Sequence, residues 1–247
     1  MRIRQLVIAA SERDQLASHI CEVFDLNVAF HDPGIIYFGL ENVLIPIGDT
    51  FLEIVTPVKE NTTAGRFINR RKGDGGYMVI VDAEDLDQEK KRVESSGIEI
   101  VYESQRTEED VTARTIHLHP KQVGGAIISI DKMKPESAWL WAGLDWKEHV
   151  NTSNSNILNG VQLQSENPKE MMSKWEHALG VKGNSDLIIE LKDSRIKFNE
   201  ISDDRGEGIT AFEISLKDQD LAIGKAEKLG LVSNEVIKIG GVDFLFN

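Results

Sequence analysis

The chain of 247 residues has a single cysteine, which excludes an internal disulfide and a zinc site built from thiolates. It is also short of positive charge, since 28 Lys and Arg residues stand against 41 Asp and Glu residues and give a formal net charge of −13. Nucleic acid and an anionic membrane would both repel such a chain, so neither is expected as a partner. The apolar run at the N-terminus is too short to span a bilayer, and we expect a protein of the reducing cytoplasm.

A phosphate-binding loop is absent as well. Residues 73–76 read Gly-Asp-Gly-Gly, but they lack the lysine spacing of a Walker motif and do not lead into a helix. We expect them to let the chain turn tightly into the strand that follows.

What the sequence does have is a repeated order of elements. Four times an apolar strand is followed by a helix of about three turns and then by two or three further strands. The opening strands are expected at residues 4–10, 77–82, 158–165 and 209–216. In the first unit, the strands after the helix are expected at residues 28–30, 35–40, 43–47 and 51–56. The pattern predicts an α+β fold of repeated units.

The two halves of the chain are separated by a polar run at residues 151–156, which is typical of a linker. We therefore predict a first domain over residues 1–133, a connector over residues 134–156 and a second domain over residues 157–247. The connector carries Trp139, Trp141 and Trp146. We expect them to fasten it onto the core, although they could also line an apolar pocket. The second domain is expected to be structural, because its interior positions carry little chemistry.

Three segments carry a resemblance to known proteins, namely residues 5–11 (QLVIAAS), 51–57 (FLEIVTP) and 119–125 (HPKQVGG). With the four units in two pairs, they resemble the vicinal oxygen chelate superfamily, which includes glyoxalase I, methylmalonyl-CoA epimerase, extradiol dioxygenases and fosfomycin-resistance proteins. A glyoxalase-like subgroup of bacterial proteins without a settled activity is similar at residues 38–42, 48–53, 63–66, 73–78 and 141–146. The resemblance is strong over residues 1–150 and is limited to the pattern beyond them. It implies four βαβββ units that form two tandem glyoxalase-like domains with strongly curved mixed sheets.

In that superfamily, paired units hold a divalent metal that acts as a Lewis acid on an oxygen of the substrate. The resemblance places Gln5 at the ligand position of the first strand and Glu53 at that of the last strand. The matching positions of the second unit hold Gly76 or Tyr77 and Ser129. Glycine has no ligand atom and serine is a poor ligand, so no metal or other cofactor is assigned.

His117 and His119 could still complete a site for a divalent metal. They lie two residues apart on an expected strand, so both side chains should point to the same face. With Glu53 they would form a site of two histidines and one carboxylate, to which Gln5 would be added. The alternative is that a histidine at the end of a strand packs or caps a turn.

Glu53 is the candidate catalytic residue. Alternation along the expected strand puts Phe51 and Glu53 on one face and Leu52 and Ile54 on the other. A carboxylate inside a barrel would have a raised pKa and could act as a general base. A solvated or hydrogen-bonded acid at a sheet edge is the alternative.

Arg66 and Arg70 are candidates for binding an anionic group. They lie four residues apart, so a helical turn would align them, and they could clamp a carboxylate or a phosphate. The alternative is that they belong to the solvent-exposed face of a connector helix.

Two functions remain open. In the first, the N-terminal domain binds a small oxygenated metabolite in its concave sheet and acts as a lyase, isomerase or dioxygenase. This metabolite could be an anion. Glu53 would then be catalytic, and the substrate would be bound by Gln5, Arg66, Arg70, Tyr77, His117 and His119. In the second, a metal-free protein sequesters a small molecule in the same place without catalysis. The expected partner is thus a small molecule, and a monomer and a homodimer both agree with the sequence.

Overall fold

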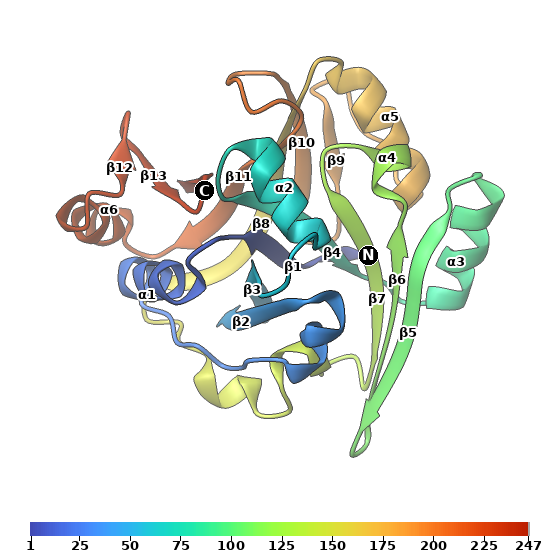
Figure 1. Ribbon diagram of the computed structural model, residues 1–247, viewed down its shortest axis with the longest axis horizontal. Helices are drawn as coiled ribbons and strands as arrows, with labels where there is room; N and C mark the ends of the chain where they lie inside the picture. The colour runs from blue at the N-terminus through green and yellow to red at the C-terminus, as the bar shows by residue number, and fades with distance from the viewer. Residues whose placement is uncertain (247) are drawn as a thin grey trace.

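The computed structural model describes residues 1–246 and has an α+β fold, as predicted (Figure 1). The elements of the N-terminal half are, in chain order, β1 (Arg2–Ala9), α1 (Arg13–Phe24), η1 (Pro33–Phe38), β2 (Leu40–Ile47), β3 (Thr50–Pro57), α2 (Thr63–Arg71), β4 (Gly75–Asp82), α3 (Leu86–Ser95), β5 (Ile100–Glu108), β6 (Val111–Leu118), α4 (Pro120–Val123) and β7 (Ile127–Lys134).

The connector contains two short 3-10 helices, η2 (Leu140–Ala142) and η3 (Trp146–His149). The elements after it are β8 (Ser155–Ser165), α5 (Pro168–Leu179), β9 (Ile188–Glu190), β10 (Arg195–Glu200), β11 (Gly208–Leu216), α6 (Gln219–Lys228), β12 (Val232–Ser233), β13 (Val236–Ile239) and β14 (Val242–Phe246). The longest helices, α1 and α5, have 12 residues each. Within residues 1–246, no helix is both long and apolar enough to cross a membrane.

The strands of the two halves pair in the same way. In the N-terminal half, β1 lies between β3, to which it is parallel, and β4, to which it is antiparallel, and β4 is parallel to β7. In the C-terminal half, β8 lies between parallel β10 and antiparallel β11, and β11 is parallel to β14. The repeated order of elements in the sequence therefore corresponds to a repeated pairing of strands.

Two predicted strands of the first unit are not strands. The sequence predicts strands at residues 28–30 and 35–40, whereas η1 covers most of the second range and Phe30 makes only an isolated bridge with Leu44. The reason is local, because Pro33 opens the helical turn and the Asp32 carboxylate accepts the N–H of Gly34 at 2.9 Å. Two strands follow the helix in the first and third units, so the βαβββ order is complete only in the second and fourth.

The strands of both halves belong to one mixed sheet, which has 14 strands within residues 1–246. The halves meet where Ile209 of β11 lies opposite Gly76 of β4. A Cβ on Gly76 would lie 2.4 Å from Cγ2 of Ile209, so only glycine lets this side chain lie against β4. The prediction of strongly curved sheets is thereby corrected. The sheet is not strongly curled. The strands of the N-terminal half do not close into a barrel of their own, because β4 pairs with β11 of the C-terminal half.

Apolar clusters lie on both sides of the N-terminal strands. On one side, Leu6 of β1 belongs to a core that also contains Phe212 of the C-terminal half and the buried residues of α1. On the other side, Val7 and Phe51 pack with Trp139 and its neighbours in the connector. We call this second side of β1–β4 the connector face. Of the residues for which the sequence predicts chemistry, it contains Gln5, Glu53 and Tyr77.

Arg71 links the N-terminal half to the loop that precedes β11. It is the last residue of α2 and is only 1% exposed. Its Nη1 donates to the carbonyl oxygens of Arg205, Gly206 and Glu207 at 2.9–3.1 Å, and its Nη2 donates to that of Ile209 at 3.3 Å. The buried guanidinium therefore holds four carbonyl groups of this loop, of which that of Ile209 is in a buried hydrogen bond.

Replacing Arg71 by methionine is expected to destabilise the protein by about 3 kcal/mol, because four buried or partly buried carbonyl groups lose their donor. The matched change Arg70→Met affects an exposed neighbour and should cost less than about 0.5 kcal/mol. Urea unfolding measures both free energies. Equal losses for the two variants would contradict the role given to Arg71.

Candidate functional site

Glu53 lies in the middle of β3 and points to the connector face. Its neighbours Leu52 and Ile54 belong to the core shared with α1, whereas Phe51 and Val55 pack with the connector. The predicted alternation of this strand is thus confirmed. The side chain of Glu53 is buried, with 6% exposed.

Two side-chain amides hold the Glu53 carboxyl group. Nε2 of Gln5 on β1 donates to Oε2 at 2.7 Å, and Nδ2 of Asn42 on β2 donates to Oε1 at 2.6 Å. The structure therefore brings together Gln5 and Glu53, which the sequence resemblance had paired. Asn42 was missed, although it is the one amide in the otherwise apolar run of residues 42–47.

The orientation of both amides is determined by their second hydrogen bonds. Oε1 of Gln5 accepts the indole N–H of Trp139 at 2.7 Å, and Oδ1 of Asn42 accepts the backbone N–H of Asp32 at 2.8 Å. Each amide must therefore turn its NH2 group to Glu53, and both oxygens of Glu53 act as acceptors. This arrangement suits the ionised carboxylate.

Burial opposes ionisation of Glu53. It raises the pKa of this carboxyl to about 7, while the hydrogen bonds from Asn42 and Gln5 pull the pKa back down. The group thus changes its protonation state near neutral pH, which is the range in which a general acid or base works best.

Asp131 on β7 forms a second buried carboxyl group. It is 1% exposed, and its Oδ1 accepts hydrogen bonds from the hydroxyls of Ser129 and of Thr115, the latter at 2.7 Å. Its Oδ2 accepts the indole N–H of Trp141 at 2.5 Å. Burial raises the pKa of Asp131 to about 6. Sequence reasoning missed Asp131, although an acid in an apolar strand two residues after Ser129 was a usable signal.

The connector tryptophans fasten the connector onto this face, as expected. The ring of Trp139 stacks on that of Phe51 with a centroid distance of 5.8 Å, and Trp146 meets the edge of the same ring at 4.9 Å. Through their indole N–H groups, Trp139 reaches Glu53 by way of Gln5, and Trp141 reaches Asp131 directly. The connector thus covers this face. It contacts Asp131 directly and is linked to Glu53 through Gln5.

Tyr77 of β4 packs against α2 on the connector face. It is buried, its ring meets Phe67 edge-on at 5.1 Å, and burial raises its pKa to about 12. The charges of Arg66 and Arg70 lower this pKa, and the charge of Glu53 raises it. Tyr77 is therefore a neutral phenol at neutral pH.

The two histidines do not join Glu53. His117 on β6 lies near the rings of Tyr102 and Phe38, at centroid distances of 4.9 and 6.3 Å, and burial lowers its pKa to about 4. His119 lies beyond the end of β6, where Pro120 begins α4. Its Nδ1 accepts the backbone N–H of Lys121 at 3.2 Å and so caps that helix.

The proposed metal ligands do not fit a divalent metal. Within residues 1–246 no group of three or more His, Cys, Asp and Glu residues could hold a metal ion. The side-chain oxygens of Gln5 and Glu53 already face N–H donors, whose positive ends would repel a cation. The alternative of a metal held by His117, His119, Glu53 and Gln5 is thereby corrected.

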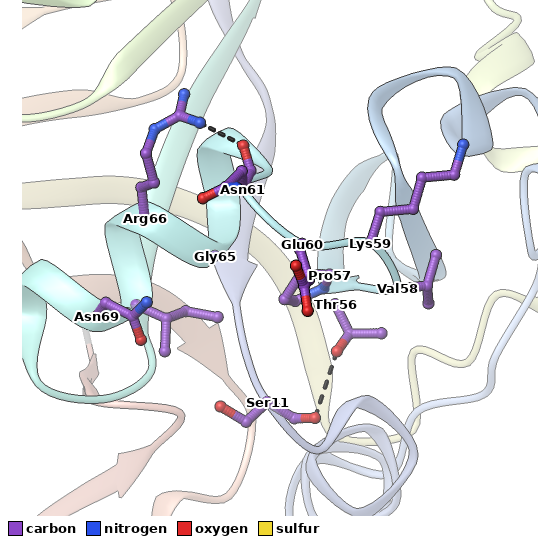
Figure 2. Close-up of a pocket in the computed structure, with 11 residues that line it drawn as sticks. Ser11, Thr56, Pro57, Val58, Lys59, Glu60, Asn61, Gly65, Arg66 and Asn69 are labelled. Carbon is purple, nitrogen blue, oxygen red and sulfur yellow. Dashed lines mark hydrogen bonds between the residues drawn. The ribbon is translucent and has the colours of Figure 1, made fainter.

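Arg66 and Arg70 are both exposed residues of α2 and do not converge. Arg70 lies over the ring of Phe67, 5.8 Å from its centroid. Arg66 donates to the carbonyl oxygen of Asn61 and lines an open hollow of about 660 Å³ between α2, the end of β3 and Ser11 (Figure 2). Figure 2 shows the Arg66 side chain turned toward Asn61 at the rim of this hollow.

Comparisons with known proteins agree with this fold. The family described as a glyoxalase-like domain matches residues 6–179. A hypothetical protein from Staphylococcus aureus, known from a crystal structure, is 14% identical over 100% of this chain and 98% of its own, with a TM-score of 0.67. Methylmalonyl-CoA epimerase from Mycobacterium tuberculosis is 22% identical over 53% of this chain and 87% of its own, with a TM-score of 0.47. No curated protein matches the chain. The similarity to the Staphylococcus aureus protein shows the fold of the whole chain.

Glu53 should make the protein less stable as the pH rises. Its pKa is about 7 in the folded state and near 4.5 when the chain is unfolded, so between these values the folded state holds a proton that the unfolded state has lost. The contribution of Glu53 to the free energy of unfolding is complete below a pH of about 4.5 and is lost by a pH of about 7. Its amplitude is about 3 kcal/mol. Urea unfolding between a pH of about 4 and a pH of about 8 measures the slope of the free energy of unfolding against pH.

The variant Glu53→Gln should flatten this slope, because glutamine does not titrate. Asp131→Asn is the control for the other buried acid, whose raised pKa adds a slope in the same direction. A Glu53→Gln protein with the slope of the parent would show that Glu53 has an ordinary pKa.

Proposed function

The chain belongs to the glyoxalase-like domain family, and from this premise we propose that its N-terminal half binds a small oxygenated metabolite at the connector face, next to Glu53. The observation that carries this proposal is the state of the Glu53 carboxyl. It is buried, it is held by two oriented amides and its pKa is about 7. A group of this kind exchanges a proton with a bound molecule at neutral pH.

In this proposal Glu53 is the general base and the amides keep its oxygens in place. Its carboxylate removes a proton from a carbon next to a carbonyl group of the ligand and then returns a proton to that carbon, so the residue itself is unchanged. Tyr77, a neutral phenol that packs against Phe67 of α2, donates a hydrogen bond to an oxygen of the ligand. Arg66, an exposed residue of α2 whose charge acts on Tyr77, attracts an anionic group of the ligand.

Access to Glu53 requires movement of the connector. Trp139 is fully buried and stacks on Phe51, so a ligand must displace part of residues 134–156 before it reaches the carboxyl. The indole hydrogen bond to Gln5 is then exchanged for a bond to the ligand, which keeps the amide satisfied.

A second candidate function is sequestration without catalysis. The observation that favours it is that both oxygens of Glu53 already accept hydrogen bonds from Gln5 and Asn42. A carboxyl that keeps both bonds would orient a ligand without taking its proton.

Both versions assign the ligand to residues 1–133, with 134–156 as the closing segment and 157–247 as a second domain. They place the protein in the cytoplasm with a small molecule as its partner. Neither version needs a nucleic acid, a membrane or a second copy, so a monomer is sufficient and a homodimer remains compatible.

The test uses a panel of small 2-oxo and 2-hydroxy acids and their esters. A ligand is expected to raise the melting temperature of the protein, and in deuterium oxide the proton next to its carbonyl should exchange for deuterium. The variant Glu53→Gln should retain the melting shift and lose at least about a hundredfold in exchange rate, as expected for removal of a general base. Proton NMR of the ligand measures this rate.

Glu41→Gln is the matched control, because Glu41 is exposed and lies next to Asn42 on β2. It should leave binding and exchange unchanged. Binding without exchange in the parent protein would select sequestration, whereas no binding by any member of the panel would contradict both functions.

A further inference from the structure

The C-terminal half has a face that corresponds to the connector face and is polar. Ile196 and Phe198 of β10 point into the shared core, so Arg195, Lys197 and Asn199 point to the opposite side. We call this side of β8, β10 and β11 the polar face. It occupies the same place in the strand pairing as the face that carries Glu53.

An ion pair with a buried carboxylate crosses the polar face at Gly160. In the strand register, Gly160 of β8 lies between Arg195 of β10 and Glu213 of β11. A Cβ on Gly160 would lie 2.5 Å from Oε2 of Glu213, so the glycine leaves the space in which this carboxylate reaches across β8. Oε2 accepts the Nε–H of Arg195 at 2.7 Å.

This ion pair holds the guanidinium in one orientation. Glu213 is 2% exposed, whereas the side chain of Arg195 is 42% exposed. Oε1 of Glu213 also accepts the amide N–H of Gln162 at 2.7 Å, and Oε1 of Gln162 accepts that of Asn199 at 3.0 Å. The inner edge of the guanidinium is therefore held by a hydrogen-bonded carboxylate, and its outer edge carries the two Nη groups.

Lys197 is the second basic residue of the polar face. It is two residues from Arg195 on the same strand and shares its face. Within residues 1–246, neither Nη of Arg195 donates a hydrogen bond, and Lys197 has no ion pair. A planar pair of N–H donors and an ammonium group on the same face of a sheet are groups that bind a carboxylate or a phosphate.

We propose that the polar face binds a small oxyanion, a carboxylate or a phosphate group, through the Nη groups of Arg195 and the ammonium group of Lys197. Glu213 positions the guanidinium, and Gln162 and Asn199 hold Glu213. This proposal departs from the expectation that the second domain is structural. The site lies in the other half of the chain from Glu53 and does not depend on the function proposed there.

Calorimetric titration of the full chain at constant ionic strength tests the proposal, with inorganic phosphate in one arm and succinate in the other. Saturable binding in either arm is expected, and the arm that binds more tightly identifies the oxyanion. Lys197→Gln should weaken this binding about tenfold, which corresponds to the loss of one charge-assisted hydrogen bond.

Lys228→Gln is the matched control, because it removes the same charge from an exposed position on α6 and should leave the affinity unchanged. Arg195→Lys keeps a charge beside Glu213 while removing the outer pair of N–H donors, and it should also weaken binding without unfolding the chain. The absence of saturable binding in both arms would overturn the proposal. Equal affinity of the Lys197→Gln and Lys228→Gln proteins would overturn it too.

Discussion

A continuous series of hydrogen bonds connects the connector to the centre of the N-terminal sheet, from the indole of Trp139 through Gln5 to the carboxyl of Glu53. Asn42 completes it from the other side. Burial of the carboxyl works against its ionisation, and the two oriented amides work for it. The pKa of about 7 is the balance of these effects. Three features depend on this one arrangement. They are the position of the connector over the face, the misfit of Gln5 and Glu53 with a metal ion, and the proposed proton transfer.

The two halves of the molecule use the same strand pairing for different purposes. In the first half the face is covered, because tryptophans of the connector pack on Phe51 and satisfy the polar groups beneath them. In the second half the corresponding face keeps a charged pair, Arg195 and Glu213, for which Gly160 leaves space. Arg71 and the Ile209 contact join the halves through backbone groups. A repeated fold therefore supports two chemically distinct surfaces.

Local patterns in the sequence predicted the elements that depend on local forces. Apolar alternation placed Glu53 on the correct face of its strand, and the spacing of the units predicted the repeated pairing. The errors came from side-chain hydrogen bonds that the strand and helix patterns do not encode. No sequence pattern predicts the hydrogen bond from the indole N–H of Trp141 to Asp131. His119 caps a helix because Pro120 ends the strand. The number of strands in the first unit was wrong because an Asx turn at Asp32 competes with strand formation.

The central claim is that the Glu53 carboxyl titrates near neutral pH inside the folded protein. Carbon-13 NMR of glutamate side-chain carboxyls measures this directly, with the Glu53→Gln protein used to assign the resonance. A midpoint at a pH of about 7 is the result that the structure predicts. A midpoint near the ordinary glutamate value of 4.5 would show that the hydrogen bonds from Gln5 and Asn42 outweigh burial, and it would contradict the claim.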